Sequence, residues 1–273
     1  MKVALASWGL PGWWIQLVLR ALAQARTTIF AVEVFAGVGE VSKALTATIG
    51  LCRSFDCQSD PNHDILRPEG LAALLCWIVE IRPGGLLWMG VPCATWVALS
   101  RASTLRSMFL PRGPDDCSKK VFEHNVIQSI SSFLMLTATA LQISVIIEQP
   151  QTSLLFARDF RCARGPESLY WTLKLTDVAE VSFFMEAFGG STRKGMRLVG
   201  TAQWLHEFNL VAKSLWGRRP TTKQKCSLPL IRHHPKARRS TQARRMYWLT
   251  VLRTLRPLQR QWLCSVQGPR MAK

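Results

Sequence analysis

A cysteine and a glutamate follow two strand-like stretches and could work together on one substrate. Cys93 comes after the apolar stretch 86–91 (LLWMGV), and Glu148 comes directly after the apolar stretch 143–147 (ISVII). A thiolate at the end of a strand is a nucleophile, and a carboxyl group that leaves an apolar strand is expected to have a raised pKa and to hold a proton. The residues alone leave two plainer interpretations open, an inert core cysteine and a glutamate paired with an arginine.

Two other strand ends carry residues suited to holding a cofactor. The turn 35–40 (FAGVGE) follows the first strand-like stretch, and its glycines would let the backbone approach a ligand closely. Asp56 ends the next such stretch, 51–56 (LCRSFD), where a carboxylate can accept hydrogen bonds from ribose hydroxyls. Asp64 could contact an adenine amino group of the same ligand. A tight glycine turn and two turn or capping aspartates are the alternatives.

The elements that must position these residues alternate between strand and helix. Helices are expected at 40–48, 71–81 and 116–142, the second of them closed by a turn at 83–85, and a long loop is expected at 101–115. The alternation predicts an α/β fold, a Rossmann-like, doubly wound, mostly parallel sheet with helices on both faces. Two later stretches, 178–188 and 196–201, predict an antiparallel hairpin at the edge of the sheet. Ligands bind such a sheet at the carboxyl ends of its strands.

Taken together, these strand ends resemble the cytosine carbon-5 DNA methyltransferases, especially short phage-like and mobile-element-like members of that superfamily. The matching residues occur in the family's order: Phe35, Gly37, Gly39 and Glu40 in the cofactor turn, then Asp56 and Asp64, then Pro92 and Cys93, then Glu148 and Pro150. Segment 188–198 is similar to a Gly-x-x-x-Arg-Lys-x-x-Arg segment of the short members. The resemblance covers residues 29–205.

The resemblance implies a class I methyltransferase fold and an enzyme that transfers a methyl group from S-adenosyl-L-methionine to carbon 5 of cytosine in DNA. Cys93 would attack carbon 6 of a base flipped out of the duplex, and Glu148 would contact ring nitrogen 3 and the exocyclic amine. Arg193 and Arg197 would lie near the base or its phosphate. The implied cofactor-binding residues are Phe35, Gly37, Gly39, Glu40, Asp56, Asp64 and Pro92, with Asp56 on the ribose. No metal is implied.

The chain also departs from the family. Gln149 stands where the family has asparagine, the interval 56–64 leaves little room for a third strand and its helix, and no large target-recognition domain fits after the hairpin. Two alternatives therefore stay open beside the DNA methyltransferase. One is a catalytically silent domain of the same type that binds nucleic acid, and the other is an RNA cytosine methyltransferase.

Positive charge is gathered at the C-terminal end of the chain. The formal net charge is +18, and residues 208–273 hold 16 of the 35 basic residues and none of the 17 acidic ones. We therefore expect three parts: an N-terminal apolar helix at 1–28, a methyltransferase-like domain at 29–207 and a basic extension at 208–273. Cations interleaved with Trp and Tyr predict that the extension binds nucleic acid, with a solvated, disordered tail as the alternative.

The remaining composition favours an intracellular protein, nuclear if its source is eukaryotic. With 48% hydrophobic residues the chain can build a core, which excludes a fully disordered chain. Its eight cysteines include no CxxC pair, so we expect reduced thiols and neither a disulfide framework nor a zinc site. The apolar run 3–19 leaves a signal segment or anchor open, although we favour a packed helix. We expect a monomer that binds DNA rather than RNA and does not bind membranes.

Overall fold

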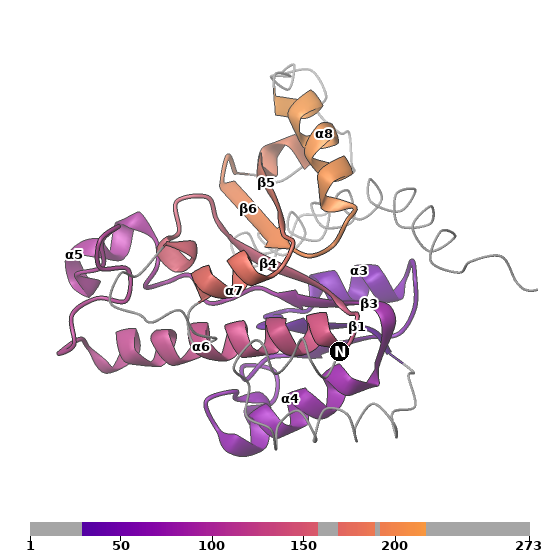
Figure 1. The fold of residues 1–273 in the computed structure, drawn as a ribbon, viewed down its shortest axis with the longest axis horizontal. Coiled ribbons are helices and arrows are strands. Elements are labelled where there is room, and N and C mark those ends of the chain that lie inside the picture. Colours follow the sequence, from indigo (N-terminus) through magenta and orange to yellow (C-terminus); the bar gives the residue numbers. More distant parts are fainter. Residues whose placement is uncertain (1–28, 158–168, 189–191, 217–273) are drawn as a thin grey trace, which may run out of the picture.

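One six-stranded sheet organises the chain. The computed structural model describes residues 29–157, 169–188 and 192–216 (Figure 1). The helix expected near the N-terminus, and the basic extension from residue 217 on, lie outside these residues. Within them the strand order is β2-β1-β3-β4-β6-β5, with helices on both faces of the sheet. The prediction of an α/β fold with a mostly parallel, Rossmann-like sheet is confirmed at that level.

The four strands that lead to the glycine turn, Asp56, Cys93 and Glu148 run parallel. They are β1 (Ile29–Val34), β2 (Cys52–Phe55), β3 (Ile81–Met89) and β4 (Ser144–Pro150). Strand β1 pairs with β2 and β3, and β3 pairs with β4. Leu86 lies opposite Ser144 and Met89 opposite Ile147, so the strands that lead to Cys93 and Glu148 are neighbours, as one crossover through a long helix predicts.

An antiparallel hairpin completes one edge of the sheet, as expected. It consists of β5 (Ala179–Phe184) and β6 (Gly195–Gly200). Strand β6 lies between β4 and β5 and runs antiparallel to both of them. The hairpin therefore adds two strands to the sheet beside β4, the strand that contains Glu148. Residues at the start of β6 lie beside the end of β4.

Successive side chains of the central strands enter two cores on opposite faces of the sheet. Val145 and Ile147 pack in one core, whereas Ile146 packs in the other, because side chains alternate along a strand. The first core lies under α4 (Pro68–Glu80), α6 (Lys119–Ala140) and α7 (Leu169–Leu175). The second lies under α3 (Glu40–Thr46) and α8 (Leu205–Trp216). Both faces are apolar, which explains why these strands read as continuous hydrophobic runs.

Two strands are longer than the sequence predicts. The turn expected at 83–85 is a bulge inside β3: Ile29 pairs with Ile81 but Ala31 pairs with Leu86, and Gly84 takes up the extra chain at φ 74°. Strand β4 continues through Pro150. Its pairing with β3 ends at Ile147, but its pairing with β6 extends to Pro150. Glu148 therefore lies within a strand and not after one.

The connections contain short helices. The long loop expected at 101–115 includes α5 (Arg101–Thr104), and single 3-10 turns occur at η1 (Pro61–His63), η2 (Ala98–Ser100), η3 (Leu154–Phe156) and η4 (Met185–Phe188). Helix α8 runs across the boundary that the sequence predicts between residues 207 and 208, and its Phe208 and Ala212 are buried. The folded body thus continues at least to Ala212. No helix of the described residues is both long and apolar enough to cross a membrane.

Candidate active site

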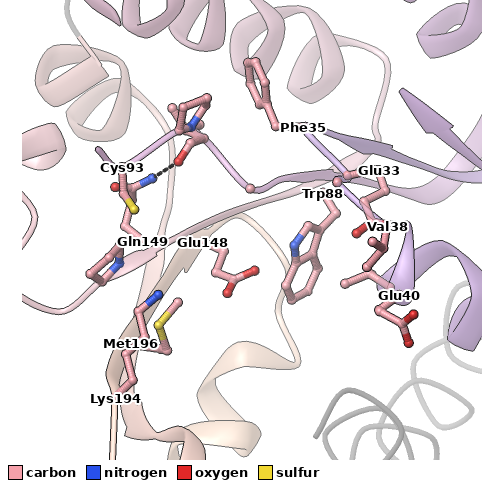
Figure 2. Close-up of a pocket in the computed structure, with 17 residues that line it drawn as sticks. Glu33, Phe35, Val38, Glu40, Trp88, Cys93, Glu148, Gln149, Lys194 and Met196 are labelled. Atoms are coloured by element: carbon pink, nitrogen blue, oxygen red, sulfur yellow. Dashed lines mark hydrogen bonds between the residues drawn. The ribbon is translucent and has the colours of Figure 1, made fainter. Parts of the chain in front are cut away.

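A pocket of about 290 Å³ opens where β1, β3 and β4 end and β6 begins (Figure 2). Cys93 and Glu148 both line it, together with Trp88 and the turn after β1. In Figure 2 the Glu148 side chain points into the space between Cys93 and Trp88. The pairing of β3 with β4 brings the thiol and the carboxyl group to one edge of the sheet. The two residues that the sequence suggests could work together therefore line one pocket.

Gln149 fixes the backbone that leads to Cys93. Its side chain is 1% exposed, and its amide nitrogen donates a hydrogen bond to the carbonyl oxygen of Val91. Its amide oxygen accepts a hydrogen bond of 2.8 Å from the hydroxyl group of Ser153. One buried amide therefore ties the segment before Cys93 to β4 (Figure 2). The sequence shows Gln149 only as a departure from a family pattern, and its positioning contacts emerge from the structure.

Asp56 shapes the glycine turn. One of its carboxylate oxygens accepts a hydrogen bond of 2.8 Å from the backbone N–H of Gly37, and the other accepts one of 2.8 Å from that of Gln58. Gly39 has φ 70°, and a Cβ there would lie 2.8 Å from the Ser54 hydroxyl oxygen, so this position requires glycine. A Cβ at Gly37 would meet no described atom within 4 Å, which leaves the backbone of the turn accessible beside the pocket.

The two acids expected to hold a nucleoside lie outside the pocket lining. Asp56 is engaged with the glycine turn. Asp64 accepts a hydrogen bond of 3.0 Å from the backbone N–H of Leu66. Of the other residues implied to bind the cofactor, Phe35, Gly37, Glu40 and Pro92 line the pocket, whereas Gly39 does not. Each aspartate oxygen can still accept a further hydrogen bond, because a carboxylate offers about four lone-pair sites.

Glu33 is a pocket residue that the sequence analysis did not single out. It is 6% exposed, and its carboxylate accepts a hydrogen bond of 2.7 Å from the backbone N–H of Ser42. Burial raises the pKa of Glu33, and the nearby Glu40 adds to the increase, although hydrogen bonds from Ser42 oppose it. The available signal was one acid inside an otherwise apolar strand, IFAVEV. Glu40 itself forms an ion pair of 3.3 Å with Lys43.

The structure brings a lysine to the pocket where the resemblance implies arginines. Lys194 lines the pocket, whereas Arg193 lies with its guanidinium group 5.1 Å from the centre of the Phe184 ring. Arg197 pairs with Gln149, the residue next to Glu148 in β4. Because side chains alternate along a strand and paired residues share a face, the Arg197 side chain lies on the opposite face of the sheet from that of Glu148. There it forms an ion pair of 3.1 Å with Glu180. The structure does not bring Arg197 to Glu148.

The chemistry of the pocket is that of a thiol, several carboxyl groups and an amine. Among the described residues, no group of three or more His, Cys, Asp or Glu side chains could hold a metal ion.

A scan against protein-family models and a search of curated proteins find no match for this chain. Function is therefore inferred from the residues and geometry of the pocket.

Proposed function

We propose that this chain is an S-adenosylmethionine-dependent methyltransferase that acts on carbon 5 of cytosine in DNA. The observation that carries the proposal is that Cys93 and Glu148 line one pocket with the turn after β1. A nucleophile, a hydrogen-bonding acid and a glycine turn for a cofactor are the three parts that this reaction needs. The mostly parallel sheet with an antiparallel hairpin at its edge also agrees with what the resemblance implies.

The residues around the pocket suit this cofactor. Glu33, Glu40 and Glu148 supply three carboxyl groups, and Lys194 supplies one amine. S-adenosylmethionine carries a sulfonium and an ammonium group, and the Glu40 carboxylate is the lining acid that could attract them, because Glu148 is the proposed proton donor and burial raises the pKa of Glu33. When bound, the cofactor would supply an electrophilic methyl group. A pocket of about 290 Å³ lies at the small end of the range for ligand sites, so we assign the adenosine end to Asp56 and Asp64 outside it.

Cys93 and Glu148 would divide the chemistry between them. The Cys93 thiolate would form a bond to carbon 6 of cytosine and push the electron pair of the 5,6 double bond toward carbon 5. Glu148, as the protonated acid, would transfer its proton to ring nitrogen 3 through a hydrogen bond and so make the ring more electrophilic. Carbon 5 would take the methyl group as the bond between that group and the cofactor sulfur breaks, which would leave the cofactor as a neutral thioether. A solvent base would then take the proton of carbon 5, the bond between the Cys93 sulfur and carbon 6 would break, and the Cys93 thiolate and the Glu148 acid would be restored.

Nucleoside analysis tests the proposal. The purified chain is incubated with tritiated S-adenosylmethionine and a mixture of DNA and RNA, and the nucleic acids are then digested and separated. We expect the label in 5-methyldeoxycytidine. Cys93→Ser should abolish it, whereas Cys57→Ser should not, because Cys57 is exposed and lies outside the pocket lining. Label in 5-methylcytidine alone would favour the RNA enzyme, and cofactor binding without transfer would favour the catalytically silent domain.

A further inference from the structure

A buried arginine holds the chain that follows Cys93. Arg106 is 2% exposed, and its guanidinium carbon lies 3.5 Å from the centre of the Trp96 ring. One terminal nitrogen donates to the carbonyl oxygen of Pro111 (2.6 Å) and the side-chain oxygen of Asn125 (2.9 Å). The other donates to the hydroxyl oxygen of Thr95 (3.2 Å) and to a backbone carbonyl of α6 (3.2 Å). One side chain thus links the loop after Cys93 to α6.

The contacts of Arg106 are all with neutral groups. No carboxylate of the described residues forms an ion pair with it. Burial lowers the pKa of Arg106 to about 10, so the side chain keeps its charge at neutral pH. Removing a charge from water is costly, and apolar residues of similar volume often pack at lower cost. The four hydrogen bonds and the ring contact offset that cost and fix the orientation of every group they reach.

Trp96 and Thr95 connect this arginine to Cys93. The backbone N–H of Trp96 donates to the carbonyl oxygen of Cys93 (2.9 Å), and the Trp96 carbonyl oxygen accepts from Leu154 (2.9 Å), which follows β4. The Thr95 hydroxyl oxygen accepts from Arg106, and its proton can go to Nδ1 of His124 at 3.0 Å. Burial and the charge of Arg106 both lower the pKa of His124, which keeps the ring neutral and able to accept that proton.

Apolar burial does little to hold the rest of this loop. Leu99 is 97% exposed, Met108 is 59% exposed and Phe109 is 82% exposed. Helix α5, between them in the sequence, lies at one end of the molecule (Figure 1). The buried side chains of the loop are instead polar or touch Arg106: Thr95, Trp96, Thr104 and Arg106 itself. The contacts of Arg106, together with the burial of Trp96 in the apolar core, therefore restrain the segment.

We infer that Arg106 is a positioning residue that holds segment 93–106 against α6 in the free protein, so that the Cys93 thiol lies in the pocket before any substrate binds. This role does not rest on the proposed function, because it concerns the placement of Cys93 whatever reaction follows. It predicts that loss of Arg106 loosens this segment while the sheet stays intact.

Hydrogen exchange of the full chain, read by mass spectrometry, tests this role. In Arg106→Met, backbone amides of 95–106 should exchange at least tenfold faster than in the wild type, and those of Val145 and Ile147 should be unchanged. Arg101→Met is the matched control, because Arg101 is exposed on the same segment. Unchanged exchange in 95–106 would overturn the inference. Faster exchange in β4 by the same factor would also overturn it, because Arg106 would then support the fold as a whole.

Alkylation of Cys93 by iodoacetamide gives a second readout, with the exposed Cys57 as a reference in the same chain. In Arg106→Met the rate at Cys93 relative to that at Cys57 should change severalfold, and an unchanged ratio would contradict the positioning role. If Arg106→Met does not fold, Thr95→Val removes one acceptor of Arg106 and the partner of His124. It should loosen 95–106 in the same local pattern, and a wild-type exchange pattern in that variant would overturn the inference.

Discussion

Replacing Gln149 with leucine removes both hydrogen bonds by which this buried side chain joins the segment before Cys93 to β4. The Val91 carbonyl oxygen and the Ser153 hydroxyl proton would lose their partners. A buried polar group without a partner costs about 1–3 kcal/mol, so two of them cost about 2–6 kcal/mol. The Ser153 oxygen still accepts from the backbone N–H of Leu155, and leucine fills similar space, so we expect about 2–4 kcal/mol.

Thermal unfolding followed by calorimetry measures this cost. For a domain of this size, 1 kcal/mol corresponds to about 2–4 °C, so the melting temperature of Gln149→Leu should fall by about 4–16 °C. Gln151→Leu is the matched control, because Gln151 is only half-buried, and it should shift the melting temperature by far less. If Gln149→Leu melts within 1–2 °C of the wild type, the two hydrogen bonds do not hold the Val91 segment as we describe.

Three further outcomes follow from the structure. Because the pKa of Glu33 is raised in the folded state, the stability that its proton contributes is lost as the pH rises above the usual 4.5. The melting temperature of Glu33→Gln should therefore increase relative to that of the wild type between pH 4 and pH 8. A difference that does not depend on pH would contradict this. The pKa of His124 is lowered in the folded state, so the free energy of unfolding should fall as the pH drops below 6.5, where the histidine of the unfolded state takes up a proton. The side-chain oxygen of His124→Asn can still accept a hydrogen bond from Thr95. In urea titrations between pH 7 and pH 5, this variant should therefore lose less stability than the wild type. Removing residues 217–273 leaves α8 whole and deletes 15 positive charges, because Lys213 is the one basic residue of 208–273 that remains. The salt dependence of DNA binding should therefore become shallower. An unchanged slope would mean that the extension does not contact DNA.

The sequence predicts the sheet well because its strands are buried on both faces. Continuous apolar runs such as ISVII, separated by helices, leave few arrangements other than a parallel sheet. Once β3 and β4 are joined by one crossover helix, Cys93 and Glu148 must approach the same edge. Both features are local in the sequence or follow from general rules of chain connection.

The contacts that complete the site depend on register and on residues far apart in the chain. Lys194 enters the pocket and Arg197 does not, because the register of β6 against β4 decides which face each side chain takes. Arg106 reaches Asn125, 19 residues away, and Gln149 reaches Val91, 58 residues away. No local pattern reveals such partners. Gly84 shows the same limit, because a turn signal cannot distinguish the end of the preceding helix from a bulge within the next strand.

The most direct test of the proposed reaction is covalent trapping with DNA that contains 5-fluorocytosine, in the presence of S-adenosylmethionine. Fluorine cannot leave carbon 5 as a cation in the way that the proton leaves, so the bond between Cys93 and carbon 6 should persist. We predict a complex that is stable in detergent, with the adduct on the peptide that contains Cys93, and we predict that Cys93→Ala abolishes it. Glu148→Gln should slow its formation strongly, because an amide can donate a hydrogen bond but cannot supply a proton. An adduct that survives Cys93→Ala would contradict the assignment of the nucleophile.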